Sequence, residues 1–197
     1  MRERPILFTG AMVRAILSGQ KTQTRRLCKL PMRSSMPEPE LLSLVQQCPY
    51  GTIGDRLWVR ESLGYCSEYG HYFKAGDEHG GRVHLCSLFD DEERGTGYSY
   101  EGLLPERAVP SIHLPRKYSR IQLELTGVRV ERLQDISQGD AIAEGAPPSH
   151  QSIDAISREY GYPDFPRSWY AQLWDSINGA GAWDSNPHVW VLEFRRI

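Results

Sequence analysis

Residues 18–26, SGQKTQTRR, gather the side chains with the most chemical potential in the sequence: Lys21, Thr22, Thr24, Arg25 and Arg26. Amines and guanidinium groups donate hydrogen bonds to anions, and a threonine hydroxyl becomes a nucleophile when a base removes its proton. The segment therefore predicts the floor of a pocket for a phosphate, a nucleobase or a nucleoside.

The charge distribution is uneven along the chain. The whole chain has a formal net charge of −2, whereas residues 1–33 contain eight lysines and arginines and one acid. A balanced overall charge argues against a general polyanion binder. The basic excess near the N-terminus fits either a phosphate-binding loop or a solvated basic face.

Two short helices are predicted to position this chemistry. In TGAMVRAILSGQ, Thr9 is a candidate N-cap and Gly19 a stop signal, so Lys21 follows the end of an amphipathic helix. In SQGDAIAEG, Ser137 and Asp140 have the spacing of a capping box and a glycine ends the pattern. Glu144 therefore falls at the end of the second helix.

The remaining patterns mix strands and helices. We expect a strand within residues 54–61, a long strand around 121–131 that bends at a glycine or divides there, and a last strand in 188–197. Helices are predicted for residues 152–160 and 166–178, and the aromatic side chains of the latter are expected in a core. Residues 66–109 read as a surface insertion within a single domain spanning residues 1–197.

Composition bounds the class of protein. The chain has 197 residues, of which 40% are hydrophobic and 24% charged, and no apolar run has the length of about 20 residues that a membrane span needs. The N-terminus lacks the pattern of a signal peptide, and the four cysteines form no CxxC pair. We expect a cytoplasmic protein with free thiols, no membrane association and no obligate protein partner.

Several motifs together resemble one family. They are KTxTxR at 21–26, GDRLWVRE at 54–61, DAIAEG at 140–145 and VWVLEF at 189–194, and in this order they resemble the ASCH family. The stretches PSIHLPR at 110–116 and LWDSINGAGAWDSNP at 173–187 are similar to ASCH proteins encoded in phages and prophages. The resemblance implies an α+β fold of the PUA-like type, a small curved β-barrel with flanking helices.

The resemblance also implies an activity. The KTxTxR motif is similar to that of the bacterial N4-acetylcytidine amidohydrolases, which release acetate and cytidine without a cofactor. It implies that Lys21 and Thr24 are catalytic and that Glu144 is the catalytic glutamate. Amide hydrolysis needs a nucleophile, a base and a proton donor, roles that fit Thr24, Lys21 and Glu144 in that order. Lys21 can act as a base near neutral pH only if its pKa is lowered.

A non-catalytic alternative uses many of the same residues. PUA-like domains also bind RNA or read modified bases, and here phosphates would be contacted by Lys21, Arg25, Arg26, Arg116, Lys117 and Arg120. Trp58 and Tyr118 are candidates for stacking on a base. A modified nucleoside or RNA is the expected partner under either hypothesis.

A metal site is the weakest hypothesis. Cysteine and histidine, the ligands that zinc prefers, gather within the predicted insertion, at Cys66, His71, His79, His84 and Cys86. Their spacing matches no standard zinc pattern, so we expect no metal.

Overall fold

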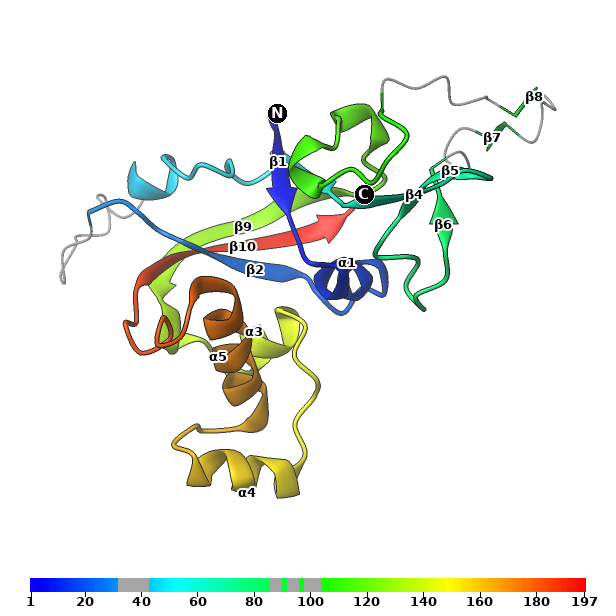
Figure 1. The fold of residues 1–197 in the computed structure, drawn as a ribbon. Helices are drawn as coiled ribbons and strands as arrows, with labels where there is room; N and C mark the ends of the chain where they lie inside the picture. Colours follow the sequence, from blue (N-terminus) through cyan, green and yellow to red (C-terminus); the bar gives the residue numbers. More distant parts are fainter. Residues whose placement is uncertain (32–42, 86–89, 92–95, 98–103) are drawn as a thin grey trace. The chain divides into compact units, whose positions relative to one another are not determined.

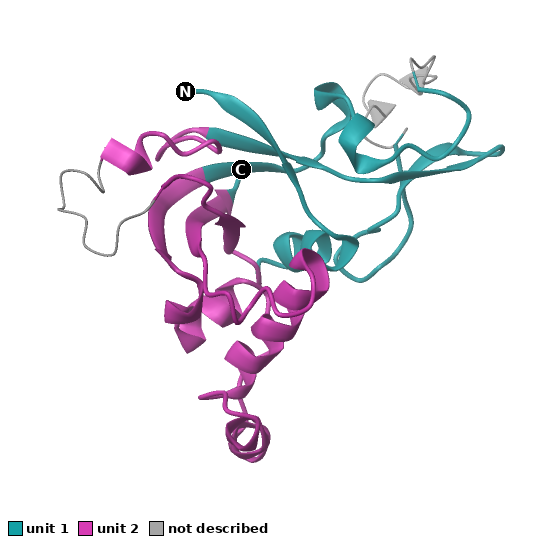
Figure 2. Cartoon of the chain, turned by 60° about the vertical axis from the view of Figure 1, so that its left-hand side comes forward, with its two compact units in different colours: residues 1–19, 56–124, 196–197 teal, residues 20–55, 125–195 magenta. Residues whose placement is uncertain are grey.

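The computed structural model describes residues 1–31, 43–85, 90–91, 96–97 and 104–197 (Figure 1). The chain divides into two compact units, unit 1 with residues 1–19, 56–124 and 196–197, and unit 2 with residues 20–55 and 125–195 (Figure 2). The prediction of a single domain stays a prediction. In the described part of the chain, no helix is both long and apolar enough to cross a membrane.

Unit 1 contains the first strand and helix together with the middle of the chain. Its elements are β1 (Glu3–Leu7), α1 (Gly10–Leu17), β3 (Arg56–Arg60), β4 (Leu63–Cys66), β5 (Gly70–Phe73), β6 (Val83–His84), β7 (Asp90–Asp91), β8 (Thr96–Gly97), the 3-10 helices η2 (Ser111–His113) and η3 (Arg116–Tyr118), and the start of β9 (Gln122–Arg132).

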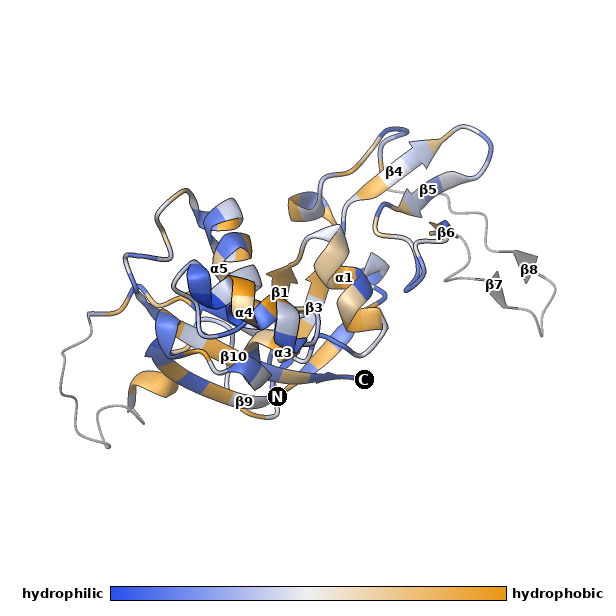
Figure 3. Cartoon of the chain, turned by 90° about the horizontal axis from the view of Figure 1, so that it is seen from below, coloured by the Kyte–Doolittle hydropathy of each residue, from blue (hydrophilic) through white to orange (hydrophobic). Residues whose placement is uncertain are grey.

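β3 forms the middle of the strand pairing in unit 1. It runs parallel to β1 and antiparallel to β9, and Arg56 lies opposite both Glu3 and Glu124. Alternation along the strand turns Leu57 and Val59 to one face, where both are fully buried. The strand predicted within residues 54–61 is therefore confirmed, and Figure 3 shows the apolar colours along β1 and β3.

Helix α1 is the helix predicted before the SGQKTQTRR segment. Thr9 caps it, because the Thr9 hydroxyl accepts a hydrogen bond from the backbone N of Met12 at 3.4 Å. Val13 and Ile16 are buried. Gly19 follows the helix with φ of +78°, a conformation that glycine adopts without strain.

The predicted insertion at 66–109 is described only in part, and Cys86 lies outside the described residues. β4 pairs antiparallel with β5, and β5 with β6, while Leu63 forms a bridge with Val109. Leu63 and Val109 pack in a buried cluster of unit 1 with Phe73 and Leu85. The described part of this segment is thus attached to a core, and its status as an insertion stays a prediction.

Unit 2 contains the polar segment and most of the C-terminal region. Its elements are β2 (Gln23–Leu27), the larger part of β9, the 3-10 helix η4 (Leu133–Asp135), α3 (Gln138–Ala143), α4 (Gln151–Glu159), α5 (Phe165–Asn178) and β10 (His188–Arg196) as far as residue 195. The predicted helices and the final strand are confirmed. β9 is one continuous strand rather than two.

The core of unit 2 joins α3 and α5 to one face of β10. Val189 and Val191 of β10 pack in a buried cluster with Tyr170 and Trp174 of α5 and with Ala141 of α3. The prediction that the aromatic residues of α5 belong to a core is confirmed. α5 starts at Asp164, whose Oδ1 accepts a hydrogen bond from the backbone N of Arg167 at 2.9 Å.

The sheet that contains these strands is open. Its hydrogen-bonded order is β1-β3-β9-β10-β2, and among the described residues β1 and β2 do not pair with each other. The prediction of a mixed α+β fold is confirmed, but the predicted closed barrel is corrected. Closure depends on the tilt and stagger of every strand, and short sequence motifs do not encode those quantities.

The capping box of α3 provides a test of stability. Ser137 Oγ accepts a hydrogen bond from the backbone N of Asp140 at 3.0 Å, and the Asp140 carboxylate accepts one from the backbone N of Ser137 at 3.4 Å. Ser137→Ala should lower the free energy of unfolding by about 1 kcal/mol, because an N-terminal N–H of the helix loses its acceptor. Urea denaturation followed by circular dichroism measures the change.

The matched control is Ser176→Ala, which replaces an exposed serine inside α5 and should leave stability unchanged or slightly raised. A Ser137→Ala protein as stable as the wild type would show that the capping box contributes nothing.

Candidate functional site

Strand β2 divides the polar segment between two faces. Side chains alternate along a strand, so Gln23 and Arg25 share one face and Thr24 points to the other. The register agrees, because Arg25 lies opposite Val191, which packs with α3 and α5, and Thr24 lies opposite Leu192. Gln23 and Arg25 therefore face the helices of unit 2.

Lys21 lies just before β2 and reaches the same side. Lys21 Nζ donates hydrogen bonds to Glu144 Oε2 at 2.6 Å, to the Glu144 carbonyl at 2.8 Å and to the Gln23 carbonyl at 2.8 Å. These three oxygens match the three donors of an ammonium group. The side chain of Lys21 has 0% of its surface exposed and that of Glu144 has 2%, so the Lys21–Glu144 pair is buried.

The end of helix α3 holds Glu144 in this position. Glu144 is the C-terminal cap of α3, and its backbone N donates to the Asp140 carbonyl at 2.8 Å. The backbone N of Thr22 donates to the Ala143 carbonyl at 2.9 Å, which fastens the segment before β2 to the end of the helix. The carbonyl groups at a helix C-terminus favour a cation, which adds to the attraction between Lys21 and Glu144.

Arg25 links the pair to other acids. Its Nη1 donates to Gln23 Oε1 at 2.6 Å and to Glu144 Oε1 at 3.3 Å. Its Nε and Nη2 donate to Glu131 Oε1 at 3.0 and 2.5 Å, and Nη2 lies 3.3 Å from Asp140 Oδ2. The two oxygens of Glu144 thus have different partners, Lys21 at Oε2 and Arg25 at Oε1.

Tyr170 is also a member of the site, although the sequence predicted only a core position for it. Its hydroxyl donates to Glu144 Oε1 at 3.4 Å, and its ring lies beside the Arg25 guanidinium at 5.9 Å. Burial, together with the charge of Glu144, raises the pKa of Tyr170 well above its usual value, so it stays a neutral donor. Its spacing from Trp174 indicated packing, and no sequence signal marked its hydroxyl.

Arg129 forms the half-exposed edge of the network. It donates to Glu131 Oε2 at 3.1 Å and to Asp140 Oδ1 at 3.2 Å, and it also pairs with Glu193. Gln23 Nε2 donates to the same Asp140 oxygen at 2.9 Å. Arg25 and Arg129 therefore share their acids, which fixes both guanidinium groups.

Burial shifts the pKa of Lys21 in the direction that would favour its acting as a base. Removal from water lowers the pKa of Lys21 from its usual value of 10.5, and the nearby Glu144 carboxylate opposes this shift. A lysine with a lowered pKa lies closer to the range in which an amine accepts a proton.

Among the predicted catalytic residues, Thr24 is the one whose side chain lies on the other face of β2. Its side chain is buried, and it lies opposite Leu192 rather than toward Glu144. Thr22 is exposed and Arg26 is half-buried. The geometry therefore unites Lys21, Glu144 and Arg25 and directs the Thr24 hydroxyl away from them.

The other predicted binding residues all belong to unit 1. The Trp58 ring is buried between Arg60 at 4.8 Å and Arg116 at 6.0 Å, and Arg116 pairs with Glu3 at 2.9 Å. Arg120 makes two hydrogen bonds to Glu61, at 2.9 and 2.7 Å.

Tyr118, the other stacking candidate, is buried in the cluster that contains Leu63 and Phe73. Lys117 lies over its ring at 4.7 Å. Within unit 1, these rings are therefore used for internal packing.

Within the residues that the structure describes, no group of three or more histidine, cysteine, aspartate or glutamate side chains is placed to hold a metal ion. The His71 ring nitrogen Nε2 instead lies 3.1 Å from the carbonyls of Pro105 and Arg107.

Comparison with known proteins gave two solved structures. One is protein EF3133 from Enterococcus faecalis V583, assigned to family model DUF984, with 10% identity, a TM-score of 0.38, and coverage of 100% of this chain and 80% of that one. The other is an ASCH domain from Lactobacillus crispatus JV V101, with 11% identity, a TM-score of 0.37, and coverage of 99% and 79%. No protein-family model and no curated protein matches the sequence.

Breaking the buried pair has a predicted effect on stability and on its pH dependence. Glu144→Gln leaves the Lys21 ammonium without its carboxylate, so the free energy of unfolding should fall by about 3–5 kcal/mol near neutral pH. In this variant, the pKa of Lys21 in the folded protein falls further below its pKa in the unfolded chain. At pH values between these two pKa values, the unfolded chain binds more protons than the folded protein. As the pH rises toward 10.5, the usual pKa of lysine, the stability of the variant should therefore increase more steeply than that of the wild type.

Urea denaturation at several pH values measures both effects. Glu159→Gln, which removes an exposed carboxylate at the end of α4, is the matched control and should follow the wild-type profile. Equal slopes for Glu144→Gln and the wild type would contradict the assignment of a lowered pKa to Lys21.

Proposed function

We propose that this chain is a hydrolase of the ASCH type that removes an acyl group from the exocyclic amine of a modified nucleoside or nucleobase. The substrate expected from the motif is N4-acetylcytidine, and the products are cytidine and acetate. The observation that supports the proposal is the buried Lys21–Glu144 pair, with a hydrogen bond of 2.6 Å between two groups of the types that acid-base catalysis requires.

A single proton shift within the pair produces both catalytic groups. If the proton of the Lys21 ammonium moves along this hydrogen bond to Glu144 Oε2, the result is a neutral amine and a neutral carboxylic acid. The amine is the base that a nucleophile needs, and the acid is the donor that the departing amine of the nucleoside needs. A water-excluded site favours the neutral pair, because separated charges are expensive there.

Thr24 is the proposed nucleophile, and this role requires a local movement. Lys21 Nζ lies 2.8 Å from the carbonyl of Gln23, which belongs to the peptide unit that joins Gln23 to Thr24. In the substrate complex the amine must turn from this carbonyl toward the Thr24 hydroxyl. Catalytic hydrogen bonds often form only in such complexes.

Incubation with N4-acetylcytidine, followed by chromatography, tests the activity. The wild type should release cytidine, and Thr24→Val and Lys21→Ala should lower the rate by about a hundredfold or more. Thr126→Val, which removes an exposed hydroxyl in β9, is the matched control and should remain active. Circular dichroism establishes that each variant is folded.

The outcomes separate the roles of the residues. Full activity of Thr24→Val would exclude Thr24 as the nucleophile while leaving the Lys21–Glu144 pair in place. Absence of release and of binding by the wild type would overturn the proposal as a whole.

A non-catalytic module that binds RNA or a modified base is the second candidate. It is favoured by one observation, that the Lys21 side chain has no exposed surface in this structure. Calorimetric binding of N4-acetylcytidine without any release of cytidine would select this candidate.

A further inference from the structure

Unit 2 contains a cavity that shares no lining residue with the Lys21–Glu144 network. Its volume is about 390 Å³, within the range of sites for small ligands. Most of its lining residues are aromatic or polar, and the full set is Gln134, Tyr160, Gly161, Tyr162, Pro163, Arg167, Trp183 and Asp184. No residue of this group was a candidate in the sequence analysis.

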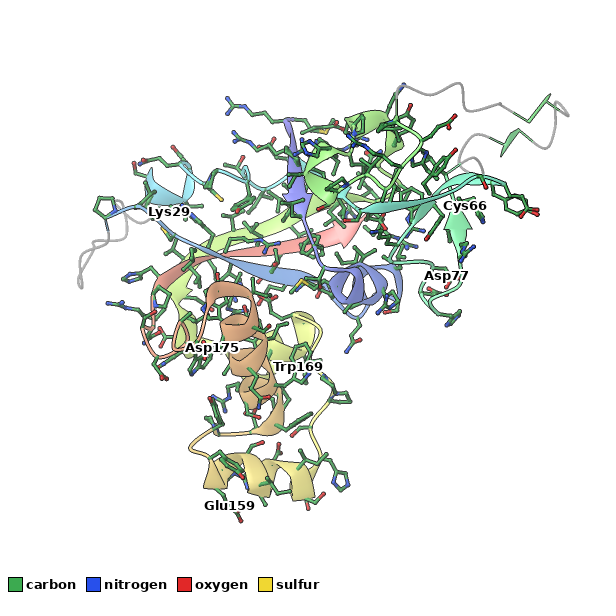
Figure 4. The ribbon with its side chains drawn as sticks, in the orientation of Figure 1. Lys29, Cys66, Asp77, Glu159, Trp169 and Asp175 are labelled. Carbon is green, nitrogen blue, oxygen red and sulfur yellow. The ribbon has the colours of Figure 1, made fainter. Side chains whose placement is uncertain are left out.

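One wall is the turn that ends α4. The backbone N of Tyr160 and that of Tyr162 both donate to the Ser157 carbonyl, at 3.2 and 3.0 Å, and Gly161 between them has φ of +84°. Tyr160 is 78% exposed although its backbone is fixed. A single exposed ring is ordinary, but here three aromatic rings line one cavity. Figure 4 labels Glu159, the residue just before this turn.

Another part of the lining, at Trp183, is held by α5. Asp175, also labelled in Figure 4, accepts hydrogen bonds from the backbone N of Trp183 at 2.7 Å and from that of Gly181 at 3.2 Å. Gln134 Nε2 donates to the Trp183 carbonyl at 3.0 Å, and the rings of Tyr162 and Trp183 lie 6.5 Å apart. The rings of Tyr162 and Trp183 are therefore preorganised, which lowers the entropy lost when a ligand binds.

The polar side chains of the cavity define the chemistry of its ligand. Arg167 supplies a guanidinium group, which forms an ion pair with Asp164 through an Nε–Oδ2 contact of 2.7 Å. Asp184 supplies a carboxylate acceptor, and Gln134 has an amide oxygen as well as the nitrogen that binds Trp183. A flat aromatic group with amino donors and a nearby negative charge would match the side chains of Arg167, Asp184 and Gln134. A nucleotide has these features.

We propose that this cavity binds one nucleotide, with its base against the tyrosine rings, an amino group at Asp184 or Gln134, and its phosphate at Arg167. The proposal rests on the proposed function only for the class of ligand. The same chemistry is offered by a nucleotide within a single strand and by a free nucleotide, and a binding experiment can tell these sources apart.

The experiment measures fluorescence anisotropy of a labelled single-stranded RNA of about 12 nucleotides, within the site sizes of known single-strand binders. Cytidine and guanosine monophosphates, measured by calorimetry, form a second arm. Tyr160→Ala should raise the dissociation constant about tenfold, because a base loses its stacking ring. Tyr160→Phe keeps the ring and should bind like the wild type.

Tyr69→Ala is the matched control, because Tyr69 is 57% exposed in unit 1 and should not affect binding. If Tyr160→Ala weakens the binding of RNA but not of the monophosphates, the ligand is a nucleotide within a strand. If it weakens the binding of the monophosphates but not of RNA, the ligand is a free nucleotide. Equal affinities of Tyr160→Ala and the wild type in both arms, or no binding in either arm, would overturn the proposal.

Hydrolysis of N4-acetylcytidine by the same variants separates this proposal from the proposed function. Tyr160→Ala should release cytidine at the wild-type rate, since Tyr160 is absent from the contacts of Lys21 and Glu144. Loss of RNA affinity in a protein without hydrolase activity would support the cavity and refute only the enzyme.

Discussion

The ammonium group of Lys21 can be buried only if oxygen atoms replace its water. An unpaired charge in a protein interior costs several kcal/mol, and here the side chain has no exposed surface. Three parts of unit 2 must meet to satisfy it: the segment before β2, the Gln23 carbonyl and the end of α3 at Glu144. This requirement fixes the position of α3 against β2, and the capping box and the Thr22–Ala143 hydrogen bond reinforce the same arrangement.

Arg25 is a second buried cation in the same region. The free energy cost of burying its charge is offset by a different set of partners. Lys21 has a carboxylate oxygen to itself, whereas Arg25 divides its donors among Glu131, Asp140, Glu144 and the side chain of Gln23. Arg129 draws on two of the same acids from a more exposed position. Networks of this kind contribute less to stability than apolar packing of equal volume, but they define one arrangement of the chain.

The sequence contained much of the local structure and little of the tertiary arrangement. Ser137 and Asp140 predicted the start of α3 and hence the place of Glu144, because capping depends on residues close in sequence. Because side chains alternate along a strand, the KTxTxR spacing indicates that Lys21 and Thr24 lie toward opposite faces. This inference can be made only once the strand is known to start at Gln23.

The contact between the Tyr170 hydroxyl and Glu144 depends on how α5 packs against α3, and no local pattern encodes it. The burial of Trp58 and Tyr118 likewise depends on tertiary packing that no local pattern encodes, and their stacking roles stay predictions. The neighbours that cover these rings, Arg116 and Leu63 among them, come from other parts of unit 1.

The two oxygens of Glu144 are inequivalent, and this decides where a proton can reside. Oε1 accepts hydrogen bonds from Arg25 and Tyr170, which both favour the anion, whereas Oε2 accepts one from Lys21. In the proposed proton shift, the proton that leaves Lys21 would therefore go to Oε2. The attraction of Arg25 for Glu144 is weakened by its shorter contacts with Glu131 at 3.0 and 2.5 Å, compared with 3.3 Å to Glu144. Glu131 and Glu144 thus share one guanidinium group, and the contacts of Arg25 with Glu131 are the shorter ones.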